Sequence, residues 1–145
     1  MAPRILVLNG PNLGQLGSRE REHYGPLDYK SLEKFIVESA ATIDVEVDVR
    51  QSDDEATLIS WLHEAMEGSI PVIFNPAGFT HYSVAIRDAC AMLRAPLIEV
   101  HLSNPLSREE FRHTSLISGL ATGTIAGFKG ESYRLALIAM RSLLD

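Results

Sequence analysis

The chain has 145 residues, 46% of them hydrophobic and 22% charged, which fits one globular domain covering residues 1–145. Its formal net charge of −6 argues against nonspecific nucleic-acid binding, which uses basic patches, and no apolar run reaches the roughly 20 residues of a membrane span. A single cysteine, Cys90, excludes an internal disulfide, and the first residues lack a signal-peptide pattern, so we expect a reduced, cytoplasmic protein.

In the first half of the chain, the hydrophobic pattern predicts two strands and two helices. An apolar strand covers residues 4–8 and is followed by a long loop rich in glycine and asparagine. A helix at residues 28–42 keeps its apolar side chains at helical spacing, and residues 45–50 alternate like a strand. The Ser-Asp-Asp-Glu sequence at residues 52–55 is a capping box that opens a helix ending near Gly68.

The second half of the chain continues the alternation. In chain order we expect a strand, a helix, a strand, a short helical turn, a strand and a final helix at residues 71–74, 83–93, 96–100, 108–111, 124–128 and 131–144. Thr80 is the candidate cap of the first of these helices. Strands that are mostly continuous apolar runs predict a parallel sheet with helices on both faces. We therefore expect an α/β fold, a flavodoxin-like three-layer sandwich with a five-stranded parallel sheet of order 2-1-3-4-5.

Polar side chains cluster just past the carboxyl ends of the first, third and fourth predicted strands. In chain order these are Asn9, Asn12, Arg19 and Tyr24, then Asn75 and His81, and then His101, Ser103, Arg108 and Arg112. In an open parallel sheet, ligands bind outside the carboxyl ends of the strands, where the strand order reverses. The three segments therefore predict one shared crevice with the layout of an active site.

The long loop after the first strand has no phosphate-binding signature. It lacks both G-x-G-x-x-G and G-K-[ST], although loops of this length often act as functional lids. Tyr24 on this loop is a candidate base, because a guanidinium such as that of Arg19 favours a phenolate over the poorly basic phenol. A packing role for Tyr24, with its hydroxyl in water, is the alternative at this point.

Glu99 and His101 lie two residues apart on one predicted strand and so share a face of the sheet. A carboxylate beside an imidazole fixes its tautomer and supports its charged form, which makes His101 a candidate proton donor; a structural buried pair is the alternative. Together with His81, these residues lack the short paired spacings of zinc sites, so we expect no metal. Only Lys129 is placed for an imine, so we expect acid–base chemistry without one.

Several motifs follow one another along the chain. They are N-G-P-N-L-x-x-L-G-x-R-E with a Tyr-Gly pair at residues 24–25, V-R-Q-S-D, N-x-x-G-x-T-H-x-S-x-A-x-R-D-A, and E-V-H-L-S-N with R-E-E-F-R. Together they resemble type II 3-dehydroquinate dehydratases over essentially the whole chain. The main departure is Arg21-Glu22, where the family usually has Pro-x, and it removes no chemical role.

The resemblance implies an enzyme that needs no cofactor and dehydrates 3-dehydroquinate to 3-dehydroshikimate in the shikimate pathway, or in quinate catabolism. The family uses a flavodoxin-like fold and an anti elimination of water through an enolate. Its members typically assemble as dodecamers, built as a tetramer of trimers.

Matched residue by residue, the resemblance makes Tyr24 the base that removes the C2 proton, with Arg19 beside it as transition-state stabiliser. Arg108 matches an arginine that helps to position the tyrosine. Asn12 matches the residue that holds a water against the enolate oxygen.

The resemblance makes His101, with Glu99 behind it, the acid that protonates the leaving hydroxyl. The residues that match substrate contacts are Asn75, His81, Arg112 and the backbone of Leu102 and Ser103, which cradles the carboxylate. Asp88 matches a residue that reaches the site of a neighbouring subunit.

Three rival functions belong to the same fold class, because a fold does not determine a function. A flavin- or nucleotide-binding domain predicts a yellow protein or stabilisation by nucleotides. A phosphoacceptor receiver domain requires acidic residues where this chain has Asn9 and Asn75. A noncatalytic binding module predicts that substitutions of Tyr24 and His101 leave function unchanged.

Overall fold

Five parallel strands form one sheet in the computed structural model, which describes residues 2–24 and 26–145. In sheet order the strands are β2 (Glu46–Gln51), β1 (Arg4–Asn9), β3 (Val72–Asn75), β4 (Leu97–His101) and β5 (Gly123–Ala126). The predicted order 2-1-3-4-5 and the parallel arrangement are confirmed. Gly25, part of one motif quoted above, lies outside the described residues.

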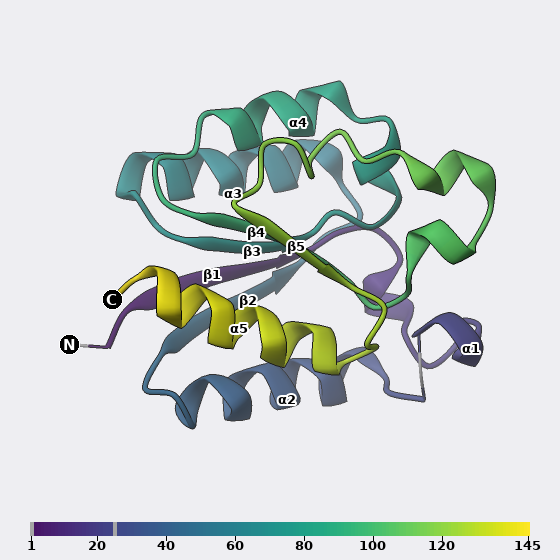
Figure 1. Ribbon diagram of the computed structural model, residues 1–145, viewed down its shortest axis with the longest axis horizontal. Helices are drawn as coiled ribbons and strands as arrows, with labels where there is room; N and C mark the ends of the chain where they lie inside the picture. Colours follow the sequence, from purple (N-terminus) through teal and green to yellow (C-terminus); the bar gives the residue numbers. More distant parts are fainter. Residues whose placement is uncertain (1, 25) are drawn as a thin grey trace.

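Helices cover both faces of this sheet (Figure 1). The helices α2 (Tyr29–Ala41) and α5 (Glu131–Leu143) lie on one face, and α3 (Glu55–Gly68) and α4 (Val84–Ala91) lie on the other. Strands covered on both sides must be apolar on both faces. Accordingly, every residue of β3 and β4 is buried, as is every residue of β1 except Arg4.

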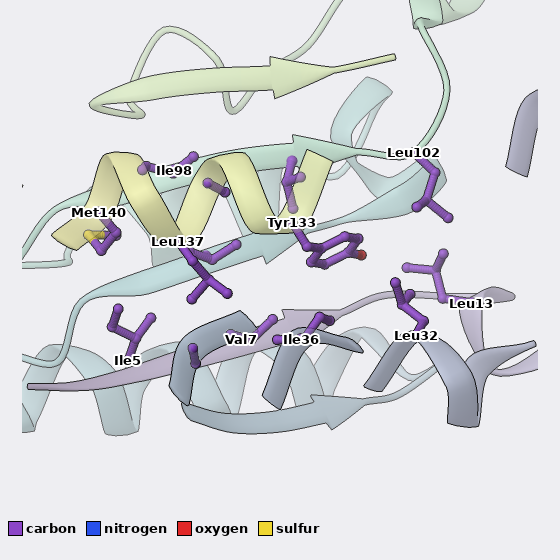
Figure 2. Close-up of a cluster of buried hydrophobic side chains, with 14 of the residues drawn as sticks. Ile5, Val7, Leu13, Leu32, Ile36, Ile98, Leu102, Tyr133, Leu137 and Met140 are labelled. Atoms are coloured by element: carbon purple, nitrogen blue, oxygen red, sulfur yellow. The ribbon is translucent and has the colours of Figure 1, made fainter. Parts of the chain in front are cut away.

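Two hydrophobic cores therefore lie on opposite sides of the sheet. Along β1, Ile5 and Val7 belong to the core under α2 and α5, whereas Leu6 and Leu8 belong to the core under α3 and α4. This division follows from the two-residue period of a strand. Figure 2 shows the first core, where Tyr133 of α5 packs among aliphatic side chains.

Short helices gather beyond the carboxyl ends of the strands, at the right of Figure 1. They are η1 (Leu13–Gln15), α1 (Arg21–Tyr24), η2 (Ala77–His81), η3 (Pro105–Ser107) and η4 (Glu110–His113). The helical turn predicted at residues 108–111 is present as η4, shifted by two residues, and the 3-10 helix η3 precedes Arg108 in addition. No helix within residues 2–24 and 26–145 combines the length and apolar character that crossing a membrane requires.

The predicted capping box at residues 52–55 is wrong. The hydroxyl oxygen of Ser52 accepts the backbone N–H of Asp54 at 3.0 Å, whereas a capping box requires the N–H of Glu55. Asp54 caps α3 instead, because its carboxylate accepts the backbone N–H of Thr57 at 3.1 Å. The helix consequently starts at Glu55.

The predicted cap of α4 is wrong for a similar reason. The 3-10 helix η2 continues past Thr80 to His81, and α4 begins only at Val84. Ser83 is the cap, and its hydroxyl accepts the backbone N–H of Ile86 at 3.1 Å. The side chain of Thr80 is buried and takes part in the site described below.

The last strand is shorter than predicted. It ends at Ala126 rather than at residue 128, because Gly127 adopts a φ of 99°, a left-handed conformation that no regular strand contains. The remaining strand and helix ends differ from the predictions by at most two residues.

Candidate active site

A cleft of about 210 Å³ lies at the carboxyl ends of β1, β3 and β4. Its lining includes every predicted site residue except Glu99 and Asp88: Asn12, Arg19, Tyr24, Asn75, His81, His101, Leu102, Ser103, Arg108 and Arg112. Since β1 and β3 are neighbours in the sheet, the cleft lies where the strand order reverses, as the polar strand ends predicted.

Tyr24 is held in this cleft by two arginines. Nη2 of Arg19 donates a hydrogen bond to the hydroxyl oxygen of Tyr24 at 2.7 Å, and its guanidinium lies 3.9 Å from the ring centroid. The guanidinium carbon of Arg108 lies 5.1 Å from the same centroid. The tyrosine side chain is largely buried, with Arg19 bonded to its hydroxyl and Arg108 near its ring.

Arg108 is itself fixed by the loop after β4. Its Nη1 donates to the hydroxyl oxygen of Ser103 at 3.0 Å, and its side chain is only 7% exposed. Its Nε is buried without a hydrogen-bond partner among the described residues, which is costly for a charged group. Arg108 therefore keeps an unused donor in the wall of the cleft.

Glu99 and His101 form a buried pair on β4, as predicted. Nε2 of His101 lies 2.5 Å from Oε2 of Glu99, and the carboxylate is fully buried. Burial acts to raise the pKa of Glu99, but the hydrogen bond and charge of His101, together with neighbouring hydroxyl groups, outweigh it and lower the pKa to about 2. An ionised carboxylate only accepts, so Nε2 of His101 donates and Nδ1 is left for another partner.

His81 reaches the cleft from η2 and is held by the loop after η4. Its Nδ1 lies 2.8 Å from the carbonyl oxygen of Thr114, which can only accept, so Nδ1 carries a proton. Burial lowers the pKa of His81, and the nearby positive charges of His101 and Arg112 lower it further. The neutral ring then presents Nε2 as a hydrogen-bond acceptor.

A tyrosine that sequence reasoning missed links β1 to β3. The hydroxyl of Tyr133 donates to Oδ1 of Asn9 at 2.6 Å and accepts from Nδ2 of Asn75 at 2.9 Å. Oδ1 of Asn75 also accepts the backbone N–H of Ala77 at 3.0 Å. Burial raises the pKa of Tyr133, which therefore stays a neutral donor. Only its hydroxyl on the apolar face of the last helix could have signalled this role.

The loop that carries Asn12 is held by two further residues that sequence reasoning missed. Asn12 has a φ of 70°, and its backbone N–H donates to Oδ1 of Asp53 at 2.8 Å. Nε2 of Gln51 donates to that same oxygen and to the carbonyl oxygen of Gly10, both at 3.1 Å. Gln51 and Asp53 belong to the V-R-Q-S-D motif, and that motif was the only feature of the sequence that pointed to them.

Gly10 lets this loop approach the loop after β3. Its N–H donates to the carbonyl oxygen of Asn75 at 2.8 Å, and a Cβ at this position would lie 2.7 Å from the carbonyl oxygen of Pro76. No residue larger than glycine fits without moving backbone.

Outside the cleft lie Asp88, Lys129 and Cys90. Asp88 is exposed on α4 and pairs with Arg87 at 3.0 Å. Nζ of Lys129 donates to the carbonyl oxygen of Glu22 on α1 at 3.0 Å. Burial raises the pKa of Cys90 to about 12, so its thiol is inert. Within residues 2–24 and 26–145, no three His, Cys, Asp or Glu side chains are arranged to hold a metal ion.

Known proteins resemble this chain over nearly all of its length. The family model described as "Dehydroquinase class II" matches residues 3–141. A 3-dehydroquinate dehydratase of Mycobacteroides abscessus is 56% identical over 133 residues, covering 92% of each chain. One of Salinispora tropica is 53% identical over 134 residues, covering 92% of this chain and 94% of the relative. The crystal structure of type II dehydroquinase from Propionibacterium acnes superposes with a TM-score of 0.95 and 46% identity, over 98% of both chains.

Proposed function

The chain belongs to the class II dehydroquinase family, and we propose that its cleft dehydrates 3-dehydroquinate to 3-dehydroshikimate with Tyr24 as base and His101 as acid. One observation carries this proposal: a tyrosine hydroxyl bonded to Arg19 and an imidazole bonded to a buried carboxylate line the same cleft. Its place in metabolism is then the shikimate pathway, or the breakdown of quinate.

In the proposed first step, the oxygen of Tyr24 removes the proton on C2 of the substrate, and the electron pair moves to the adjacent carbonyl as an enolate. A base needs an anionic oxygen, and Arg19 and Arg108 supply the compensating positive charge. Asn12 lines the cleft, and its proposed role is to hold a water molecule that donates a hydrogen bond to the enolate oxygen.

In the second step, the enolate collapses, the bond from C1 to the hydroxyl breaks, and His101 protonates the leaving oxygen to give water. Because Nε2 of His101 is committed to Glu99, the proton comes from Nδ1. The ionised Glu99 stabilises the charged ring before transfer. Tyr24 comes from α1 and His101 from the end of β4, so base and acid reach the cleft from separate elements, as an anti elimination on opposite faces of the substrate requires.

Recognition of the anionic substrate is assigned to the remaining residues of the cleft. They are Asn75, His81 and Arg112, together with the backbone of Leu102 and Ser103. The neutral His81 offers Nε2 to a substrate hydroxyl, whereas Arg112 offers a positive charge to an anion.

The direct test is an ultraviolet assay with 3-dehydroquinate after exhaustive chelation. We expect the absorbance of the conjugated enone to appear, and Tyr24→Phe to lower kcat by about 10²–10⁴-fold, the usual contribution of a general base. Tyr29→Phe is the matched control, because Tyr29 lies on α2 outside the cleft lining and its hydroxyl accepts only one long hydrogen bond, from Asn9 at 3.4 Å. Near-normal turnover by a folded Tyr24→Phe variant would contradict the base assignment.

We further propose that twelve copies assemble as a tetramer of trimers and that Asp88 reaches the cleft of a neighbouring copy. Asp88 is exposed and lies outside the cleft of its own chain, which is compatible with a role in another copy.

A further inference from the structure

Glu99 receives more hydrogen bonds than its pairing with His101 requires. The hydroxyl of Thr80 donates to Oε2 at 2.6 Å, and the hydroxyl of Ser118 donates to Oε1 at 2.6 Å. The hydroxyl of Ser115 lies 3.0 Å from Oε1 and 3.1 Å from Oε2. Three neutral donors from η2 and from the loop after η4 thus surround one buried carboxylate.

We propose that Thr80, Ser115 and Ser118 form a hydroxyl cradle whose function is to position His101: they keep Glu99 as an acceptor and so hold the ring proton on Nε2. The proposal rests on the acid role given above to His101. Without these donors, the buried carboxylate would be unfavourable as an anion and would take the proton of Nε2 for itself. Nδ1 would then be the protonated nitrogen of a neutral ring, which is a much weaker acid than the imidazolium.

The cradle is rigid because its members are themselves bonded. The hydroxyl oxygen of Ser115 accepts the backbone N–H groups of Ile117 and Ser118 at 3.1 and 3.0 Å. The backbone N–H of Leu116 donates to the carbonyl oxygen of Thr80 at 2.8 Å, which ties the loop to η2. Donors fixed in this way need no reorganisation when His101 changes its charge.

Besides His101, the three cradle hydroxyls are the hydrogen-bond donors that stabilise the charge of Glu99. A second cavity of about 290 Å³ lies behind the pair and is lined by all three cradle residues and Thr124. The other ionisable groups nearby are His81 on η2, Arg112 and His113 on η4, and the buried thiol of Cys90 on α4. None of these donates a hydrogen bond to Glu99 among the described residues.

Ser118 is the best position for a test, because it is exposed and its truncation leaves little void. We expect Ser118→Ala to lower kcat about tenfold, the effect of one hydrogen bond to a charged group, while KM changes little. Ser118→Thr, which restores the hydroxyl, should recover most of the loss. Ser60→Ala is the matched control, since it removes an exposed serine hydroxyl from α3.

The decisive comparison is with Glu99→Gln. If Ser118 acts through Glu99, adding Ser118→Ala to Glu99→Gln lowers kcat by less than about twofold more, because coupled residues are not additive. An additional tenfold loss in the double variant, or an unchanged kcat in a folded Ser118→Ala protein, would overturn the proposal.

A second readout needs neither a variant nor activity. Solid-state ¹⁵N spectra of histidine-labelled wild-type protein report which ring nitrogen of neutral His101 is protonated, and we expect Nε2. A dominant Nδ1 proton would overturn the cradle proposal even if Ser118→Ala failed to fold. Full activity of His101→Ala would instead remove the acid role while the spectra still reported on the cradle, so the two failures are distinguishable.

Discussion

At the scale of single residues, the chemistry of the cleft depends on charges that are buried together with their partners. Glu99 has no exposed surface, yet it stays ionised because His101 and three hydroxyls donate to it. Tyr24 is similarly placed against Arg19 and Arg108. In each case one partner is close in the sequence and the others come from other segments, Arg108 for Tyr24 and the three hydroxyls for Glu99.

The lowered pKa of Glu99 makes the stability of the folded protein depend on pH. Its pKa of about 2 in the folded protein lies below the ordinary 4.5, so its contribution is complete above about pH 4.5 and is lost as pH falls toward 2. We expect the melting temperature of Glu99→Gln to fall less steeply than that of the wild type between pH 5 and 2.5, in thermal unfolding followed by circular dichroism. Glu33→Gln, at an exposed position on α2, should keep the wild-type slope. Parallel curves for Glu99→Gln and the wild type would contradict the prediction.

The position of Lys129 bears on the expectation that the reaction forms no imine. Its Nζ is bonded to the carbonyl oxygen of Glu22, and it does not line the cleft. We expect borohydride added with 3-dehydroquinate to leave activity unchanged, because reduction traps only an imine. Substrate-dependent inactivation, with a lysine adduct in the mass spectrum, would show that the mechanism is covalent.

At the scale of elements, the site depends on where helices and loops begin. Asp54 caps α3 just beyond Asp53, which holds the loop of Asn12. The connection from β2 to α3 therefore serves both the helix and the cleft.

Removing the cap should destabilise α3. We expect Asp54→Ala to lower the free energy of unfolding by about 1 kcal/mol, the typical value of an N-cap, in urea titrations. Asp54→Asn keeps an acceptor oxygen and should stay close to the wild type. Equal losses in both variants would mean that charge, rather than capping, is responsible.

Removing the anchor of the Asn12 loop should impair turnover. Asp53→Ala deletes the oxygen that accepts the backbone N–H of Asn12, and we expect kcat to fall about 10- to 100-fold, since a displacement of 1 Å costs on this order. Asp53→Asn retains an oxygen and is the control. If Asp53→Ala folds normally and keeps its kcat, the loop does not need this anchor.

At the scale of the whole molecule, assembly and activity are coupled in our proposal through Asp88. We expect light scattering to give about twelve times the 16.0 kDa chain mass. Asp88→Asn should lower kcat/KM by at least about tenfold, the effect of one 1.4 kcal/mol contact, although the residue is outside its own cleft. Glu33→Gln is again the control. An active monomer would refute the coupling.

Local sequence patterns were enough to predict the layers of the fold. Strand and helix periodicity in segments such as Arg4–Asn9 and Glu131–Leu143 reflects which face each element buries, and this requires no knowledge of its partners. The strand order followed from the β-α alternation and the carboxyl-end rule, and the same rule brought the polar strand ends to one cleft.

Tertiary structure alone decided the contacts between distant segments. Tyr133 bonds to Asn9 across 124 residues, Ser118 bonds to Glu99 across 19, and Gln51 bonds to Gly10 across 41. The helix caps also differ from the predictions, because Asp54 and Ser83, rather than Ser52 and Thr80, accept the free N–H groups of α3 and α4. Such hydrogen bonds leave no periodic trace in the sequence, since they depend on which surfaces meet once the cores have packed.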